Sequence, residues 1–237
     1  MPVDILSVVD RSELFATLSG IDISVPGRVD GRTTDHAETW TIAHLLSTLG
    51  KADHLAFPLS CTHRDRPDSL VESGNVKIGI EITEAISQQY AAFSALAERE
   101  FPDALLEPAH FRWGAPNKSV EEMRGLLRQG QLSSSGWVGD RAEQEWALFL
   151  QSVIDTKLAK LARADFAKFD KNWLAIYDNL PMPHIDLAKA IAYLRPLLQD
   201  RWSRNPCFDG LFVEHGPVIA WITPTGSENL MLNDLWE

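Results

Sequence analysis

The 237-residue chain has little cysteine, no long apolar run and fewer basic than acidic residues. Its two cysteines, Cys61 and Cys207, are too few for a disulfide framework, and the sequence contains no C-x-x-C pair. No stretch approaches the ~20 consecutive apolar residues of a membrane span. The acidic N-terminus also lacks the basic start and apolar run of a signal peptide. We therefore expect a cytoplasmic protein with reduced thiols and no membrane partner.

The charge is unbalanced along the chain. Lys and Arg number 22 against 33 Asp and Glu, which gives a net charge of −11 at pH 7. Residues 206–237 contain no Lys or Arg, whereas residues 101–205 contain 14 basic and 13 acidic residues. This acidity argues against a protein that coats nucleic acid through bulk charge. It is compatible with an enzyme that contacts nucleic acid locally, mainly through the middle of the chain.

Hydrophobic periodicity predicts an α/β fold with a mixed β-sheet flanked by helices. The expected helices cover residues 4–19, 35–49, 84–100, 119–129, 140–166 and 185–201. The expected strands cover residues 53–60, 67–72, 76–83, 172–180, 208–215 and 217–224. We expect one domain with five parts: an N-terminal helix and loop extension (1–34), a first core half (35–100), a helical and loop insert (101–140), a second core half (141–224) and an acidic tail (225–237).

Two carboxylates in the first core half are candidate ligands for a metal ion. Asp68 begins one predicted strand directly after Pro67, and Glu81 lies 13 residues later within the apolar run GIEIT. In paired strands joined by a short turn, these carboxylates can meet on one face. A buried carboxylate is costly unless it is paired, and Mg²⁺ or Mn²⁺ with oxygen ligands would pair with it. The alternative is an edge-strand Asp68 and a solvated or salt-bridged Glu81.

This pattern resembles the PD-(D/E)XK nuclease superfamily. The family motif, Pro-Asp followed after a spacer by (Asp/Glu)-X-Lys on the next strand, is matched here by Pro67-Asp68 and Glu81-Ile82-Thr83. The helix before the motif often carries a further glutamate in this family, and Glu38 fits that place. The resemblance implies a restriction-endonuclease-like core and a nuclease acting on DNA. It also implies that Mg²⁺ (or Mn²⁺) is held by Asp68, Glu81, the Ile82 carbonyl and Glu38, and activates a water molecule for phosphodiester hydrolysis.

The sequence departs from the motif at its last position, where Thr83 stands in place of the family's lysine. That lysine helps to position or activate the attacking water. The candidates to replace it are Thr83 itself, Lys77 on the same strand face, Gln88 or Gln89 in the following helix, and Lys157 or Lys160 before the buried strand. The residues alone do not choose among them. The second function class is therefore a catalytically inactive protein of the same fold that acts as a binding or regulatory partner.

The predicted insert combines aromatic and basic side chains. Trp113 and Trp137 occur there together with four cations, Arg112, Lys118, Arg124 and Arg128. Aromatic and basic groups together suit a nucleic-acid strand, so we predict these four cations as nucleic-acid contacts. The alternative is a lid that packs on the rest of the domain. Whether the protein forms a homodimer or binds another protein stays open at this stage.

Overall fold

The centre of the molecule is one eight-stranded sheet whose strands follow chain order from β1 to β8. The computed structural model describes residues 5–27, 30–130 and 136–236. Strands β4, β5 and β6 run parallel to one another, and every other neighbouring pair is antiparallel. The strands are β1 (Ile5–Val8), β2 (Leu59–His63), β3 (Ser69–Ser73), β4 (Val76–Ala85), β5 (Lys171–Asp178), β6 (Gly210–His215), β7 (Val218–Ile222) and β8 (Ser227–Met231).

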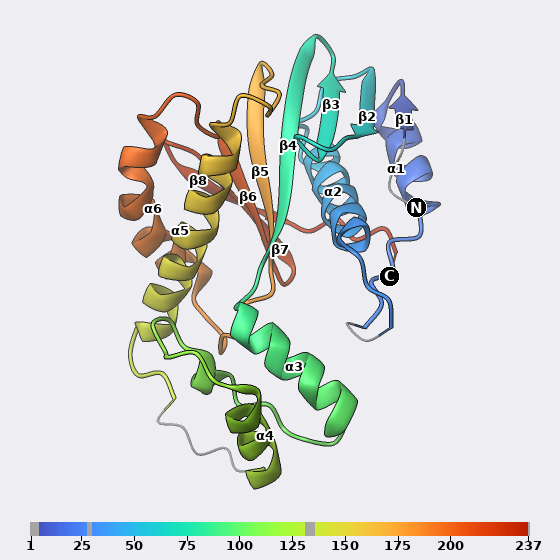
Figure 1. Cartoon of the computed structure of the whole chain (residues 1–237). Coiled ribbons are helices and arrows are strands. Elements are labelled where there is room, and N and C mark those ends of the chain that lie inside the picture. The colour runs from blue at the N-terminus through green and yellow to red at the C-terminus, as the bar shows by residue number, and fades with distance from the viewer. Residues whose placement is uncertain (1–4, 28–29, 131–135, 237) are drawn as a thin grey trace.

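Helices cover both faces of the sheet (Figure 1). They are α1 (Arg11–Ser19), α2 (Thr34–Lys51), α3 (Gln88–Glu100), α4 (Val120–Gln129), α5 (Arg141–Leu161) and α6 (Leu187–Trp202), with a short 3₁₀ helix η1 (Pro108–Phe111). Helices α1 and α2 pack on one face, and α5 and α6 pack on the other. The predicted α/β fold with a mixed sheet flanked by helices is confirmed. Among the described residues, no helix is both long and apolar enough to span a membrane.

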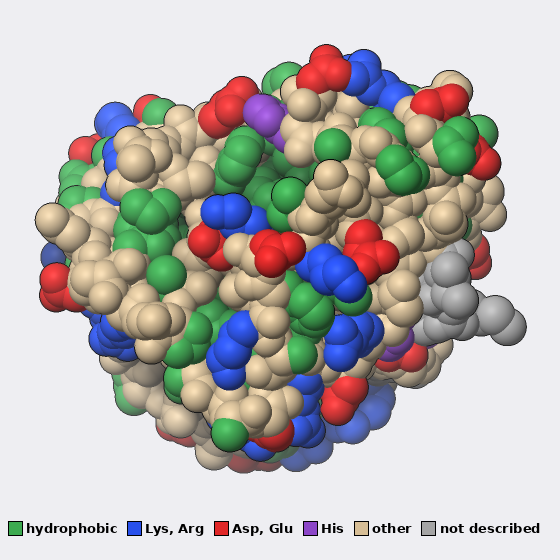
Figure 2. Space-filling view, turned by 90° about the horizontal axis from the view of Figure 1, so that it is seen from above, with side chains coloured by type: hydrophobic (Ala, Val, Ile, Leu, Met, Phe, Trp, Pro, Cys, Tyr) green, Lys and Arg blue, Asp and Glu red, His purple; other side chains and the backbone are tan. Residues whose placement is uncertain are grey.

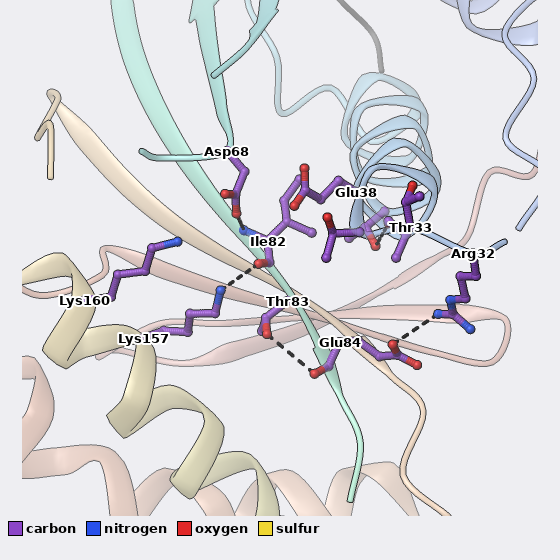
Figure 3. A pocket seen from close by; sticks show the side chains of 12 residues that line it. Arg32, Thr33, Glu38, Asp68, Ile82, Thr83, Glu84, Lys157 and Lys160 are labelled. Atoms are coloured by element: carbon purple, nitrogen blue, oxygen red, sulfur yellow. Dashed lines mark hydrogen bonds and ion pairs between the residues drawn. The ribbon is translucent and has the colours of Figure 1, made fainter. Parts of the chain in front are cut away.

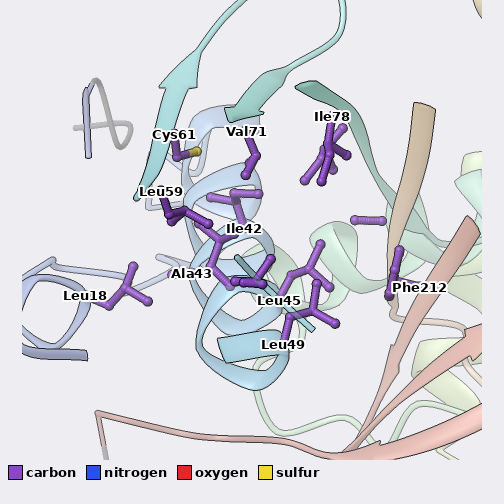
Figure 4. Close-up of a cluster of buried hydrophobic side chains, with 14 of the residues drawn as sticks. Leu18, Ile42, Ala43, Leu45, Leu49, Leu59, Cys61, Val71, Ile78 and Phe212 are labelled. Carbon is purple, nitrogen blue, oxygen red and sulfur yellow. The ribbon is translucent and has the colours of Figure 1, made fainter. Parts of the chain in front are cut away.

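Strand β4 shows how the sequence separates the two faces. Its side chains alternate, so Ile78, Ile80 and Ile82 join the core beneath α1 and α2, which Figure 4 shows in close-up. Leu46 of α2 is fully buried in this same core. Glu81 points the opposite way, toward α5, where its carboxylate pairs with two lysines of that helix.

A third, smaller core lies away from the sheet, between β4 and α5 in the chain (Figure 1). Helices α3 and α4 pack there with η1, and the buried side chains include Phe93, Phe111 and Met123. Helix α4 begins at a capping box in which Ser119 and Glu122 satisfy each other's backbone N–H groups. The predicted helix at 119–129 is therefore present, and residues 131–135 of the predicted insert lie outside the described residues.

Three predictions of secondary structure were wrong. Residues 4–19 do not form one helix, because Ile5–Val8 pairs with β2 and the Asp10 side chain caps a new helix by accepting the N–H of Glu13. The strand expected at 53–60 lies later, at Leu59–His63. The acidic tail contains β8, whose mostly exposed side chains give no alternating apolar signal.

Several helix boundaries also differ from expectation; for example, α5 ends at Leu161 rather than at residue 166. Strand β4 continues to Ala85 because it keeps pairing with β5 that far, so α3 starts at Gln88 rather than at residue 84. Helix α2 starts one residue earlier than predicted, with a capping box between Thr33 and His36. Its predicted stop, Gly50, lies inside the helix. Tertiary pairing and capping, rather than local propensity, set these boundaries.

Candidate functional site, a pocket at the open edge of β4

The candidate site lies where β4 loses its antiparallel neighbour. The ladder between β3 and β4 ends with Ser69 opposite Ile80, so the rest of β4 has an open edge on that side. A cavity of about 470 Å³ lies along this edge, between the N-terminal end of α2 and the C-terminal end of α5 (Figure 3). The cavity is lined by Arg32, Thr33, Thr34, Ala37, Glu38, Thr41, Asp68, Ile82, Thr83, Glu84, Lys157 and Lys160.

Asp68 closes the open edge of β4. Its Oδ2 accepts the backbone N–H of Ile82 at 2.6 Å, in the place where a strand partner would otherwise accept it. The side chain is only 7% exposed. Burial, together with the nearby charge of Glu81, raises the pKa of Asp68 to about 6, against the opposing effect of the Ile82 hydrogen bond. The carboxylate is held in the pocket at a cost, which is typical of groups kept for binding or chemistry.

A glycine allows the Asp68 loop to approach β4. A Cβ atom added at Gly79 would lie 2.9 Å from Pro67 Cγ and 2.7 Å from Phe169 Cδ2, closer than side chains pack. Gly79 therefore leaves room for Pro67 against the strand, and Pro67 precedes Asp68 directly. The Pro-Asp step of the motif and this glycine act together to place the carboxylate.

Glu81 is fully buried and holds two lysines. Its Oε1 accepts hydrogen bonds from the Nζ atoms of Lys157 and Lys160, each at 2.7 Å. Lys157 also donates to the Ile82 carbonyl at 3.0 Å. The pKa of Lys160 is raised, because the hydrogen bond and charge of Glu81 outweigh the opposing effect of burial. The second oxygen of Glu81, Oε2, is buried without a hydrogen-bond partner.

The opposite wall of the pocket comes from the first turns of α2. Glu38 is 21% exposed, and its Oε2 lies 3.2 Å from Nε2 of His63. Of the residues predicted for the site, Glu38, Asp68, Ile82 and Thr83 line this cavity, whereas Glu81 is fully buried and is not among its lining residues. Figure 3 shows Glu38 approaching β4 from α2, Asp68 from the residue before β3, and the two lysines from α5.

Two other predicted site residues are not part of this pocket. Lys77 and Glu81 lie on the same face of β4, but they are four residues apart along the strand, a distance of about 13 Å. Its Nζ pairs with Glu72 at 2.9 Å on the surface. Gln88 is exposed in the first turn of α3 and does not line the cavity. Gln89, the other helical candidate, accepts the backbone N–H of Lys118 instead.

The four predicted nucleic-acid cations are engaged within the chain. Arg112 pairs with Glu145, Lys118 donates to the backbone carbonyl of His110, Arg124 pairs with Glu100, and Arg128 pairs with Glu121. None of the four lines the 470 Å³ cavity. Their charges are largely compensated by neighbouring groups, which weakens the prediction that they contact nucleic acid.

The two tryptophans of the predicted insert pack on the start of α5. Trp137 donates its Nε1–H to Glu145 at 3.0 Å, and Trp113 makes an edge contact with Phe149 at 4.9 Å between ring centroids. This arrangement matches the alternative of a segment packed on the domain.

The pocket offers an oxygen donor set that fits a hard divalent cation. The set is the Asp68 carboxylate and the Ile82 carbonyl, at two residues that line the cavity, together with the Glu81 carboxylate, which is fully buried next to Ile82. The unpartnered Oε2 of Glu81 and the raised pKa of Asp68 are both features that a nearby cation would relieve. Among the described residues, no three His, Cys, Asp or Glu side chains are grouped so that they could hold a metal ion. Any such ion would therefore need backbone and water ligands as well.

Sequence reasoning missed the polar groups at the far end of the pocket. Arg32 forms an ion pair with Glu84 at 3.1 Å, and both side chains are more than four-fifths buried. Behind them, Glu214 of β6 accepts from Trp40 at 2.8 Å and contacts Nδ1 of His44 at 3.0 Å. These partners lie far apart in the chain, so no spacing rule could have joined them. The only signal was an acid inside the apolar strand sequence LFVEH.

Comparisons of the chain with protein-family models, with curated proteins and with solved structures found no match. The function of the pocket is therefore argued from its own geometry.

Proposed function

We propose that this protein is a divalent-cation-dependent nuclease of the PD-(D/E)XK type that hydrolyses phosphodiester bonds in DNA with Mg²⁺ or Mn²⁺. One observation carries the proposal. Lys157 reaches the Glu81 carboxylate at 2.7 Å and the Ile82 carbonyl at 3.0 Å. An amine therefore stands beside the acidic pair even though Thr83 occupies the lysine position of the motif.

The course of the chain supports this replacement of the motif lysine. Helix α5 precedes β5, and β5 pairs in parallel with β4, so α5 crosses over the face of β4 on which Glu81 lies. Lys157 and Lys160 are three residues apart and share one face of α5. Both amines therefore reach the same carboxylate oxygen, Oε1 of Glu81.

Each group then has a defined task. Asp68, Glu81 and the Ile82 carbonyl would hold the cation, which when bound lowers the pKa of water and stabilises charge on a phosphate. Asp68, with a pKa of about 6, is mostly ionised at pH 7 and so can act as an anionic ligand. Lys157 uses two of its three N–H donors on Glu81 and Ile82, and the third remains for a water or phosphate oxygen.

The net charge of −11 sets a limit on substrate binding. On the face shown in Figure 2, basic and acidic side chains are interspersed, and the basic groups do not gather into one band. Long-range attraction for a phosphate backbone is therefore small. Binding depends on the cation and on contacts inside the pocket.

A specific observation also favours the second function class, an inactive binding or regulatory protein of this fold. Glu81 already has two ammonium groups within 2.7 Å, so its charge is compensated without a divalent ion. In that case the pocket would be a structural ion-pair cluster. Activity and cation binding separate the two functions.

The test incubates the protein with plasmid, single-stranded DNA and RNA in MgCl₂ and in MnCl₂. Asp68→Asn and Glu81→Gln should each abolish cleavage, and Lys157→Met should reduce it at least about a hundredfold. Glu72→Gln and Lys77→Met are matched controls, because they remove the same charges from a surface pair of the same hairpin. Both controls should cleave like the wild type. Cleavage that survives Asp68→Asn and Glu81→Gln would refute the site assignment.

A second readout decides between the two functions. If the pocket holds a cation, MgCl₂ or MnCl₂ should raise the Tm of the wild type but not that of Asp68→Asn. A wild type that shows neither cleavage nor stabilisation by either cation is the inactive binding protein.

A further inference from the structure

A second cavity continues the first along α2. It has a volume of about 290 Å³ and is lined by Val25, Arg32, Ala37, Trp40 and Tyr177. Arg32, just before α2, and Ala37 of α2 line both cavities, so the two cavities are adjacent. The first cavity is lined by carboxylates and amines, and the second is lined by two aromatic rings and one guanidinium group.

The Trp40 ring is held in place from behind. Its Nε1–H donates to Glu214 at 2.8 Å, and the ring of His44 lies against it edge-on at 4.3 Å between centroids. His44 contacts the same carboxylate at 3.0 Å, so one buried acid orients both rings. The tryptophan is therefore fixed before any ligand arrives, which lowers the entropy lost on binding.

Tyr177 completes the aromatic wall from the sheet. In the register of the parallel strands it lies between Glu84 of β4 and Glu214 of β6. Its ring and that of Trp40 are 6.4 Å apart between centroids and inclined at 66°. The two rings come from a helix and a strand, and both elements are rigid parts of the core.

We propose that this second cavity binds one unpaired nucleobase of the strand whose phosphate lies at Asp68 and Glu81. The inference rests on the proposed function and names its substrate class, nucleic acid that is single-stranded or locally opened at the cleavage site. Aromatic faces bind any base by stacking, and an arginine beside them adds a cation–π contribution. A volume near the lower limit of ligand pockets, roughly 300 Å³, suits one base and not a base pair.

Arg32 joins the two cavities in a way that fits a nucleotide. Its guanidinium group is held by Glu84 at 3.1 Å and its side chain is only 16% exposed, so the group has a fixed position between the acidic pocket and the aromatic wall. A nucleotide carries its phosphate and its base on opposite sides of the sugar. The two cavities have the same order: the first would take the phosphate, the second would take the base, and the guanidinium group of Arg32 lies between them.

The charge of the chain favours the same substrate class. Duplex DNA is bound largely through phosphate contacts made by Lys and Arg, and Arg112, Arg124 and Arg128 of this chain are already paired with acids. Stacking of a base does not depend on net charge. An acidic protein can therefore hold an unpaired strand more readily than it can hold a duplex.

The test measures binding separately from cleavage. Fluorescence anisotropy in MgCl₂ follows Asp68→Asn protein, which does not cleave, with three labelled probes: a decathymidylate, an abasic oligomer of the same length, and a decathymidylate–decaadenylate duplex. The decathymidylate should bind about tenfold more tightly than the other two. A decauridylate arm tells whether the base comes from DNA or from RNA.

Substitutions then locate the base. Tyr177→Leu and Trp40→Leu, each added to Asp68→Asn, should weaken decathymidylate binding about tenfold and leave abasic binding within twofold. Tyr177→Phe keeps the ring and should bind like its parent. Trp113→Leu removes an aromatic ring outside both cavities and is the matched control. The comparison of thymidylate with abasic probe needs no core substitution, so it stays decisive if Trp40→Leu does not fold.

Equal binding of thymidylate and abasic probes, or equal loss of both in Tyr177→Leu, would overturn the base site. The proposed nuclease would still stand if the wild type cleaves and Asp68→Asn does not. Conversely, base-dependent binding with no cleavage on any substrate supports the base site and rejects hydrolysis.

Discussion

Asp68→Asn should stabilise the cation-free protein at neutral and alkaline pH while it abolishes activity. The Asp68 side chain is 7% exposed, and its pKa is raised to about 6 from the ordinary value of 3.8. Raising a pKa by one corresponds to about 1.36 kcal/mol, so the ionised carboxylate costs the folded state up to about 3 kcal/mol. Asparagine keeps an oxygen that can accept the Ile82 N–H and carries no charge.

The sign of the pH dependence follows from the direction in which the pKa of Asp68 moves. Between pH 3.8 and 6 the folded protein binds more protons at Asp68 than the unfolded chain does. The stability of the wild type therefore falls as the pH rises through this range, and the loss is complete above about pH 7. About 2 kcal/mol of the change lies between pH 4.5 and pH 8. Asp68→Asn lacks this contribution.

The assay is urea unfolding of both proteins in EDTA at pH 4.5 and at pH 8. The quantity compared is the difference in the free energy of unfolding between the variant and the wild type. Any pH-independent effect of the amide is the same at both pH values, so it does not contribute to the change in this difference. That difference should shift by about 2 kcal/mol in favour of the variant at pH 8. A difference that stays the same at both pH values would refute the reasoning. Adding MgCl₂ at pH 8 should reduce the advantage of the variant, since a bound cation stabilises only the wild type.

Three further predictions concern other parts of the molecule. Lys157→Met should reduce cleavage at least about a hundredfold, whereas Lys77→Met should not, in a plasmid assay; equal effects would contradict the lysine assignment. Leu46→Ala should lower the free energy of unfolding by about 2–5 kcal/mol in urea titrations, because Leu46 is fully buried beneath the sheet. A loss below about 1 kcal/mol would argue against this core. In the folded protein at pH 8, a thiol reagent should modify Cys207 and not Cys61, because burial raises the pKa of Cys61 to about 12. In Cys207→Ser the remaining cysteine is Cys61, and its labelling in the folded protein would contradict that burial.

The sequence could predict the parts of the fold that rest on local pattern. The strict alternation from Val76 to Thr83 gave β4, and the Gly-Asn turn signal gave its hairpin with β3. From these, the meeting of Asp68 with the strand of Glu81 followed from pairing geometry. Strand β8 could not be predicted in this way, because only Leu230 of its five side chains is buried.

Contacts between distant segments were beyond prediction for a physical reason. Lys157 and Glu81 are 76 residues apart, and which helical face reaches β4 depends on how α5 packs. The choice among Lys77, Lys157 and Lys160 therefore needed the crossover itself. The link from Trp40 to Glu214 spans 174 residues, and the acid inside the apolar strand sequence signals a buried partner without saying which residue it is.

The chain-order sheet has a consequence for how the protein gains its pocket during folding. Each strand pairs with its neighbours in sequence, so the β2–β3–β4 and β6–β7–β8 meanders close through short loops. Such low contact order favours early formation of both meanders. The contacts of Lys157 and Lys160 with Glu81 need α5 to dock across β4 from the other half of the chain. An incompletely folded chain thus carries the acids without their amines, and the complete pocket marks the chain whose two halves have joined.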